Sequence, residues 1–398
     1  MYFWGTNIFE IKKNILAALF STAFSLLSIA QENSVFRFLS LPYLQQLTEN
    51  SVTVISVASN PCVSYVQIGE SPEVLRPVFN SKHGQIDANL PLQKIRLSGL
   101  KPGTEYYYQV VSKEIKLYQA YKIVYGDSAV STIRSFVTPS RNISKFSFLA
   151  FNDVHSRPAF IDEVYQRNKD VSLVCYNGDM LDDIYSRDEI IQNFAAPAAA
   201  SFGGTIPFVY TRGNHETRGP AARELSDFLD TPNGSYYYSF SIGNTMFMVL
   251  DTGEDKADTH PVYAGLADYD RYRTEQAEWI KRTIASHEWI KAKHRIVCAH
   301  IPATATNDGW HGSEEIAKKF LPLLNKAKLD LYLSGHTHEP VLEKPGANHN
   351  FTMVVGGGPM KQDNNGNVTY IRVDVDNRNL KVGLYKYNGE LITEYKVK

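Results

Sequence analysis

The sequence predicts an α/β domain with a largely buried sheet, preceded by a small all-β sandwich. From about Phe36 to Pro139, short runs of strand-type residues are separated by turn residues, at a spacing typical of a sandwich. From Lys145 onward, apolar strand-like runs alternate with helical patterns, which predicts a sheet covered by helices. The length of 398 residues fits two or three domains.

The composition is that of an ordinary globular protein. Hydrophobic residues make up 43% of the chain and charged residues 21%, enough to bury a large core. The net charge of -1 gives no indication of nucleic acid or of an anionic membrane surface as a partner. Cys62, Cys175 and Cys298 are odd in number, and their spacing fits no zinc or disulfide pattern.

The first thirty residues have the pattern of a secretory signal peptide. Lys12-Lys13 precede an uncharged run from Ile15 to Ala30, and Ser28-Ile29-Ala30 end it before Gln31. This pattern predicts cleavage near Ala30-Gln31 and export to the periplasm or the medium. The run is short for a membrane span, so no span is expected after removal of the signal. The alternative is an uncleaved N-terminal anchor.

The all-β domain is expected over residues 35–139, with Pro139-Ser140-Arg141 as the linker. The segment Gly99–Tyr106 resembles the corner of a fibronectin type III domain. In that corner, Leu100 and Tyr106 would enter the core, and the tyrosine hydroxyl would bond to the backbone. The α/β domain is expected over residues 144–398 and includes the C-terminal β-strands.

Five apolar runs of the α/β domain are each followed by Asp, Asn or His. The runs and the motifs after them are Phe146–Phe151 with Asp153-Val154-His155, Val171–Tyr176 with Gly178-Asp179, Ile206–Tyr210 with Gly213-Asn214-His215, Arg295–Ala299 with His300, and Leu329–Leu333 with Gly335-His336-Thr337-His338. Ligands bind at the carboxyl ends of strands in α/β sheets, so these residues should converge on one site.

This set of side chains is too large for one metal ion. It has two carboxylates, one amide oxygen and four histidines, besides His215. Mixed nitrogen and oxygen ligands suit zinc, manganese or iron. A carboxylate that bridges two ions about 3.5–4 Å apart would use the whole set. A capping Asp, a buried core His or a glycine turn would explain one motif, but not five together. The sequence therefore predicts a site for two divalent transition metal ions.

In this order, the five motifs resemble those of the calcineurin-like metallophosphoesterase superfamily, over roughly residues 145–340. The preceding region, with Pro42-Tyr43-Leu44-Gln45 and the Gly99–Tyr106 corner, is similar to the N-terminal domain of purple acid phosphatases. The resemblance implies a four-layer α/β/β/α sandwich behind a fibronectin-like domain.

The resemblance also implies roles for the strand-end residues. One metal would be held by Asp153, His155, Asp179 and His338, and the other by Asp179, Asn214, His300 and His336. A hydroxide bridging the ions would attack phosphorus in line. Asp179 and His215 would be the catalytic residues, with His215 stabilising the transition state or protonating the leaving oxygen. The substrate phosphate would contact Asn214 and His215.

Two further residues have two interpretations each. His311, in the loop Trp310-His311-Gly312, corresponds to a position where the phosphatase subfamily has substrate-binding histidines, but it would equally suit an exposed loop. Arg212 would contact phosphate or, more simply, form a salt bridge within the domain.

The function expected from the resemblance is that of an exported phosphomonoesterase, similar to acid phosphatases, acting on a small phosphorylated substrate. A phosphodiesterase or nucleotidase of the same superfamily is the alternative, and a surface-binding protein with an inactive phosphoesterase domain is a remote one. The purple acid phosphatase pattern places an iron-binding tyrosine three residues after the bridging Asp. This chain has Asp182 there, and Asp153-x-His155 adds an imidazole, which favours divalent ions.

Overall fold

The computed structural model describes residues 35–140, 142–304, 309–358 and 368–398. The predicted signal peptide therefore lies outside the described residues. The chain divides into two units, Met1–Phe36 and Arg37–Lys398, and the second contains every element given below. Within the described ranges, no helix has the length and apolar character needed to cross a membrane.

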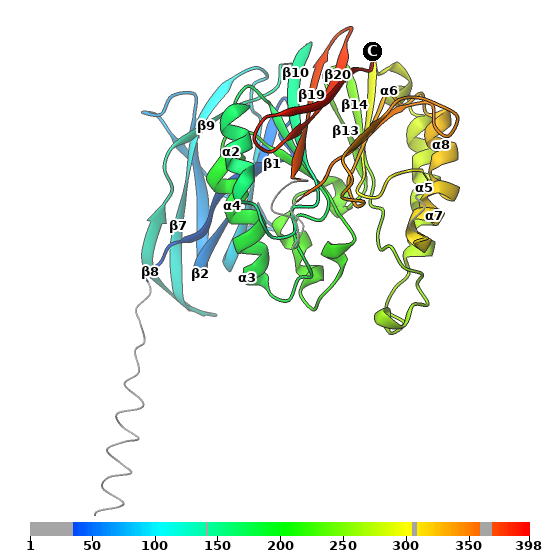
Figure 1. Ribbon diagram of the computed structural model, residues 1–398. Coiled ribbons are helices and arrows are strands. Elements are labelled where there is room, and N and C mark those ends of the chain that lie inside the picture. Colours follow the sequence, from blue (N-terminus) through cyan, green and yellow to red (C-terminus); the bar gives the residue numbers. More distant parts are fainter. Residues whose placement is uncertain (1–34, 141, 305–308, 359–367) are drawn as a thin grey trace, which may run out of the picture. The chain divides into compact units, whose positions relative to one another are not determined.

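The N-terminal region is all β, as predicted (Figure 1). Its strands are β1 (Phe38–Gln45), β2 (Ser51–Gly69), β3 (Arg76–Val78), β4 (Ser81–Lys82), β5 (Gln85–Ile86), β6 (Ala88–Ser98), β7 (Glu105–Gln119), β8 (Lys122–Val130) and β9 (Arg134–Val137). Seven of them form one sheet in the order β1-β2-β7-β8, with β3 and β6 paired to β2 and β9 paired to β7, while β4 and β5 form a separate hairpin.

Strand β2 is the organising element of this region because its two halves pack on the same core. Its first half pairs with β1 and β6, its second half pairs with β3 and β7, and the register shifts between Val57 and Cys62. Val54 and Val66 from the two halves lie in one hydrophobic cluster with Tyr106. The Tyr106 hydroxyl accepts a hydrogen bond of 2.9 Å from the backbone N–H of Lys101, which confirms the predicted corner.

The second region contains two six-stranded sheets. The first has the order β12-β11-β10-β19-β20-β21, with β10 (Lys145–Phe151), β11 (Leu173–Asn177), β12 (Phe208–Thr211), β19 (Thr369–Asp376), β20 (Leu380–Lys386) and β21 (Leu391–Lys396). The second has the order β13-β14-β15-β16-β18-β17, with β13 (Tyr238–Ile242), β14 (Thr245–Val249), β15 (His294–Cys298), β16 (Leu331–Ser334), β17 (Val341–Glu343) and β18 (Thr352–Val355).

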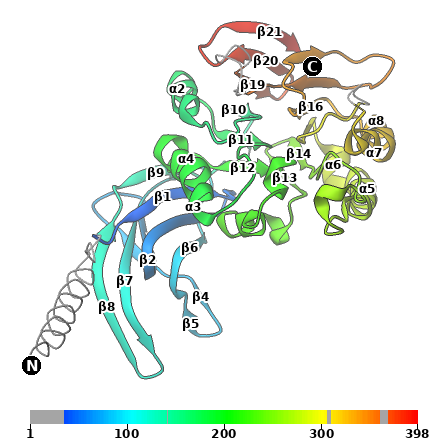
Figure 2. The same ribbon diagram turned by 60° about the horizontal axis from the view of Figure 1, so that its bottom comes forward.

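Helices cover the outer faces of the two sheets (Figures 1 and 2). The α-helices are α2 (Ala159–Arg167), α3 (Arg187–Ile190), α4 (Ala196–Ala198), α5 (Tyr269–Ile284), α6 (His287–Lys291), α7 (His311–Lys319) and α8 (Leu321–Lys326). The π-helical turns η1 (Ile191–Ala195) and η2 (Ala199–Gly203) continue α3 and α4. Short 3-10 turns are η3 (His215–Thr217), η4 (Ala222–Phe228), η5 (Pro232–Gly234) and η6 (Pro261–Tyr263).

The side chains of each strand alternate between two cores, as the pleat of a β-strand requires. In β14, Phe247 and Val249 lie in the core between the two sheets, whereas Met246 and Met248 pack under α5–α8. Leu149 and Phe151 of β10 pack toward α2 and the π-helical turns, while Phe148 faces the second sheet. The four layers are therefore helices, sheet, sheet and helices, as the family resemblance implied.

The all-β region packs on the first helical layer within the same compact unit. The buried hydroxyl of Tyr43 donates to the carbonyl of Phe228 at 2.7 Å, and that of Tyr108 donates to the carbonyl of Gly204 at 2.8 Å. Tyr43 also belongs to the hydrophobic cluster under α2. The domain boundaries at residues 35–139 and 144–398 stay a prediction.

Candidate metal centre

The predicted site residues lie at the carboxyl ends of parallel strands. Strands β10, β11 and β12 run parallel in the first sheet, and β14, β15, β16 and β18 run parallel in the second. The residues follow five of these strands closely: Asp153 and His155 after β10, Asp179 after β11, Asn214 and His215 after β12, His300 after β15, and His336 and His338 after β16. The topology thus brings five distant motifs to one place.

The backbone adopts a left-handed conformation at most of these positions. The φ angles are 53° at Asp153, 48° at His155, 53° at Asp179, 72° at His336 and 56° at His338. A non-glycine residue in this region costs roughly 1–2 kcal/mol. Strain of this kind persists where the surrounding structure enforces it, and it gathers at functional sites.

Gly213 allows the motif after β12 to approach the motif after β11. A Cβ atom at this position would lie 2.1 Å from Asp179 Oδ1, so no other residue fits without displacing that carboxylate. Glycine at this position therefore permits the close approach of the two loops.

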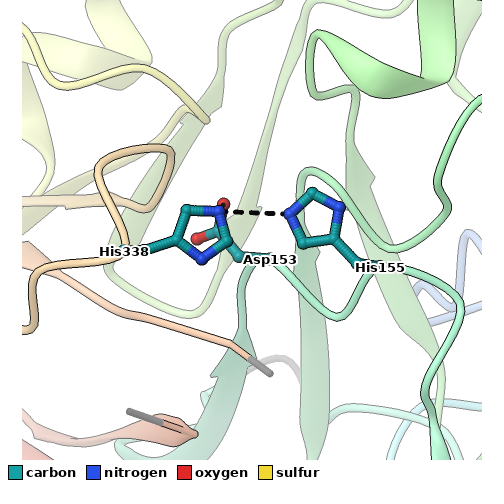
Figure 3. A group of neighbouring side chains, drawn as sticks. All are labelled: Asp153, His155 and His338. Carbon is teal, nitrogen blue, oxygen red and sulfur yellow. Dashed lines mark hydrogen bonds and ion pairs between the residues drawn. The ribbon is translucent and has the colours of Figure 1, made fainter. Parts of the chain in front are cut away.

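The first group of metal-binding side chains is Asp153, His155 and His338 (Figure 3). The two Nε2 atoms of the histidines face each other at 3.2 Å, and His338 Nε2 lies 3.6 Å from Asp153 Oδ1. His155 Nδ1 lies 3.2 Å from Asp182 Oδ1, and because a carboxylate only accepts, Nδ1 carries the proton. His155 Nε2 then presents its lone pair to the centre of the group.

The second group is Asp153, Asp179 and His300, all of which are buried. His300 Nε2 lies 3.1 Å from Asp179 Oδ2 and 3.8 Å from Asp153 Oδ1, but it is not oriented to form a hydrogen bond with either. Burial opposes the charged form of His300, yet Asp179 and Asp153 together raise its pKa to about 9. The two carboxylates thus stabilise a positive charge at this position.

Asn214 and His336 extend the centre on the side of His300. Asn214 Oδ1 lies 3.0 Å from His336 Nδ1, and the Asn214 side chain is buried. Burial and the neighbouring His300 lower the pKa of His336. A neutral imidazole is the form that binds metal.

His215 lies beside the centre, and its side chain is too far from the Asp179 carboxylate for a hydrogen bond. Its backbone N–H donates to Asp179 Oδ1 at 3.0 Å, and its Nε2 is 3.9 Å from Asp179 Oδ2. Arg218 Nη1 lies 3.2 Å from the same Nε2. Burial lowers the pKa of His215, and Arg218 lowers it further, while Asp179 opposes them. The His215 imidazole thus lies next to the Asp179 carboxylate, with its Nε2 between Asp179 and Arg218.

A cavity of about 820 Å³ opens from these residues. Its lining includes the predicted metal-site residues Asp179, Asn214 and His336, together with Trp310 and Glu339. Its volume is in the range of small-molecule binding sites in proteins.

Residues 146–340 match the family model described as calcineurin-like phosphoesterase. Those residues belong to the calcineurin-like phosphoesterase family. The matched segment begins at β10 and ends just after the Gly335–His338 motif, so it includes all five motifs that line the candidate centre.

Known proteins resemble this chain over a longer stretch than the family model covers. Purple acid phosphatase 3 of Arabidopsis thaliana is 24% identical over 324 residues, which are 70% of this chain and 85% of the plant protein. The purple acid phosphatase PPD1 of yellow lupin (Lupinus luteus) superposes with a TM-score of 0.64 at 17% identity, covering 89% of this chain and 73% of its own. The structure of PhoD gives a TM-score of 0.62 at 13% identity, covering 93% and 94%.

These comparisons confirm the predicted superfamily and a mixed α/β fold with an N-terminal all-β region. They also confirm the enzyme class at the level of a metal-dependent phosphoesterase.

Two further residues of the phosphoesterase region have partners outside the groups that form the centre. His311 Nε2 pairs with both carboxylate oxygens of Asp270 at 2.9 Å, so its phosphate-binding role stays a prediction. Arg212 donates to Asp251 at 2.6 Å and stacks on the ring of Tyr236, which is the salt bridge that the sequence favoured.

Glu216 has a role in the phosphoesterase region that the sequence analysis missed. This buried carboxylate accepts hydrogen bonds from the backbone N–H groups of Asp179 at 3.0 Å, Met180 at 2.5 Å, Leu181 at 3.0 Å and Gly213 at 2.8 Å. It joins the loop after β11 to the loop after β12. Its place directly after Asn214-His215 was visible in the sequence, but its partners were not.

Proposed function

We propose that this chain is a phosphomonoesterase that uses two divalent metal ions, with the ligand sets predicted from the sequence. The observation that carries the proposal is the convergence of Asp153, Asp179 and His300 with the imidazoles around them at the strand ends. Among known arrangements, two carboxylates shared between two groups of nitrogen ligands suit a dinuclear hydrolase.

The distances between the side chains fit bound metal ions. Two ligand atoms that each lie about 2.0–2.2 Å from the same ion are roughly 3.0–3.6 Å apart. His155 and His338 approach at 3.2 Å, His300 and Asp179 at 3.1 Å, and Asn214 and His336 at 3.0 Å. The buried Nε2 of His300, without a hydrogen bond in the described residues, has a natural partner in a cation.

The two carboxylates lie where a shared ligand is needed. Asp179 Oδ2 is 3.1 Å from His300 Nε2 and 3.9 Å from His155 Nε2. Asp153 Oδ1 is 3.8 Å from His300 Nε2 and 3.6 Å from His338 Nε2. The family resemblance assigns the bridge to Asp179, and its distances to residues of both ligand sets support that choice.

Bound metal ions would supply Lewis acidity toward the phosphoryl oxygens and lower the pKa of a water nucleophile. Asn214 and His215, which line the cavity, would contact the phosphoryl group, and His311 stays a further candidate for this contact. His215 would stabilise the transition state or carry a proton to the leaving oxygen.

Activity and metal content together test the proposal. With zinc, manganese or iron(II), the enzyme should hydrolyse para-nitrophenyl phosphate faster than its bis-ester or nucleotides, and it should bind two metal equivalents. Asp179→Ala should lose both metals and activity, whereas Asp170→Asn, which changes an exposed carboxylate paired with Arg372, should keep them. Faster turnover of the bis-ester would favour a diesterase, and two full equivalents bound to Asp179→Ala would refute the assignment.

We also propose that the protein is exported, on the basis of the signal-type pattern in residues 1–30. The expected mature N-terminus is Gln31 or a residue close to it. N-terminal sequencing of protein from the producing cell tests this, and an intact Met1 would indicate an anchor instead.

A further inference from the structure

Arg218 has an unusually fixed side chain next to the candidate centre. Its Nε and Nη2 donate to the two carboxylate oxygens of Glu254 at 2.8 Å and 2.9 Å, and Nη2 also lies 3.3 Å from Asp255. A two-point bond of this kind fixes both the position and the plane of a guanidinium group.

Glu254 is itself held in place. Its side chain is only 1% exposed, and one of its oxygens also accepts a hydrogen bond of 2.9 Å from the Thr217 hydroxyl. Its backbone carbonyl accepts from the buried Arg273. The position of Arg218 is therefore determined from the protein interior, and not by solvent.

The remaining nitrogen of Arg218 is aimed at His215. Nη1 lies 3.2 Å from His215 Nε2, and this is the imidazole nitrogen nearest to Asp179 Oδ2, at 3.9 Å. A guanidinium has donors and no acceptor. His215 Nε2 must then present its lone pair to Arg218, so the neutral ring carries its proton on Nδ1.

The other side of the ring is consistent with this tautomer. His215 Nδ1 lies 3.6 Å from Asp183 Oδ1, and among the described residues neither buried atom has a hydrogen-bond partner. A proton on Nδ1 would point toward a carboxylate, which is favourable. The opposite tautomer would place two donors face to face at Arg218 and a lone pair toward Asp183.

We infer that Arg218 is a positioning residue of the hydrolytic site, which sets the orientation and the tautomer of His215. It would act through His215, because Nη1 reaches that ring and the guanidinium is otherwise bound to Glu254 and Asp255. This inference rests on the proposed function for its effect on catalysis, but the tautomer of His215 is a property of the protein alone.

A double-mutant cycle tests the catalytic part with metal-loaded enzyme. Arg218→Ala should lower kcat by about 10-fold or more on para-nitrophenyl phosphate and leave metal content unchanged, and guanidinium ion should restore part of the loss. In a His215→Asn background, the same change should alter kcat by less than about 2-fold, because the residue through which Arg218 acts is gone. Full additivity of the two changes would overturn the inference.

Two further variants separate positioning from loss of structure. Arg218→Gln keeps a donor and a similar length, which guards against a misfolded Arg218→Ala, and it should retain more activity. Arg372→Ala is the matched control, since Arg372 makes a similar two-point bond with Asp170 at 2.9 Å and 2.6 Å. Arg372→Ala should leave kcat unchanged, and added guanidinium ion should not raise the kcat of this variant.

Nitrogen NMR of histidine-labelled protein tests the tautomer without any substrate. The His215 signals, identified by their loss in His215→Asn, should show the Nδ1–H form in the wild type and a shift toward the Nε2–H form in Arg218→Ala. A wild-type ring with its proton on Nε2 would overturn the inference. If the tautomer is as expected but no phosphoester is hydrolysed, the proposed function fails and the positioning stands.

Discussion

At the scale of single residues, Asp182 distinguishes this chain from purple acid phosphatases. It occupies the position where their pattern places an iron-binding tyrosine, and in the structure it holds His155 Nδ1 at 3.2 Å. Tyr185, three residues further on, is 65% exposed. The position near the first group is thus filled by a carboxylate that orients an imidazole.

From this residue we predict a colourless enzyme. Iron-loaded protein should lack the intense visible band of a tyrosinate bound to ferric iron, because Asp182 occupies the position of the iron-binding tyrosine and Tyr185 is 65% exposed. Visible absorption spectroscopy of the iron-loaded protein checks this. A strong band that disappears in Tyr185→Phe would contradict it.

His215 provides the second prediction at this scale. His215→Asn should lower kcat by about 10²–10⁴ while two metals remain bound, because the ring acts on the reacting group and not as a ligand. The loss should be larger for a poor leaving group than for para-nitrophenol. Near wild-type kcat on a poor leaving group would mean that the ring has no role in proton transfer.

At the scale of elements, Glu216 connects the ends of two strands. Its carboxylate accepts four backbone N–H groups from the loops after β11 and β12, including those of Asp179 and Gly213. Burial and the nearby Asp179 raise its pKa to about 7. The elements that present the candidate ligands are therefore held together by one side chain.

Glu216→Gln should destabilise the protein and weaken metal binding together. One acceptor oxygen is replaced by an NH₂ group that faces backbone donors, at a cost of about 1–3 kcal/mol for each buried group left unpaired. Denaturant unfolding of the metal-free protein and a metal titration measure the two effects. The control Glu163→Gln, which changes an exposed pair with Arg167, should cost less than about 0.5 kcal/mol.

At the scale of the whole molecule, the all-β region is part of the support of the phosphoesterase region. Tyr43 of β1 is fully buried and donates to Phe228, in the 3-10 turn η4 that follows the Asn214-His215 loop. Tyr43 also packs in the cluster that includes Phe208 of β12. The two regions thus share a core behind one of the strands that lead to the centre.

Tyr43→Phe should lower the free energy of unfolding by about 1–2 kcal/mol, since it leaves a buried carbonyl without its donor. Activity at low temperature should be unchanged, because Phe208 and the packing around the ring remain. Denaturant unfolding with a parallel activity assay checks both. A loss of activity without a loss of stability would show that the hydroxyl affects the centre directly.

Local sequence was enough to predict the candidate centre. Each motif lies at the end of an apolar strand, and parallel strands of a sheet end on the same side, so convergence followed from patterning alone. The corner at Tyr106 was also local, since Lys101 and Tyr106 are only five residues apart. Such features depend on neighbours in the chain, which the sequence displays directly.

Only the tertiary structure decided how the side chains around the centre are oriented. Arg218 and Glu254 are 36 residues apart, and His311 pairs with Asp270, 41 residues away. Which nitrogen of His215 faces a donor, or whether a loop histidine reaches the cavity, depends on contacts between elements that no local pattern specifies. The sequence by itself determined which residues gather at the centre, and the packing of distant elements determined which atoms they present to it.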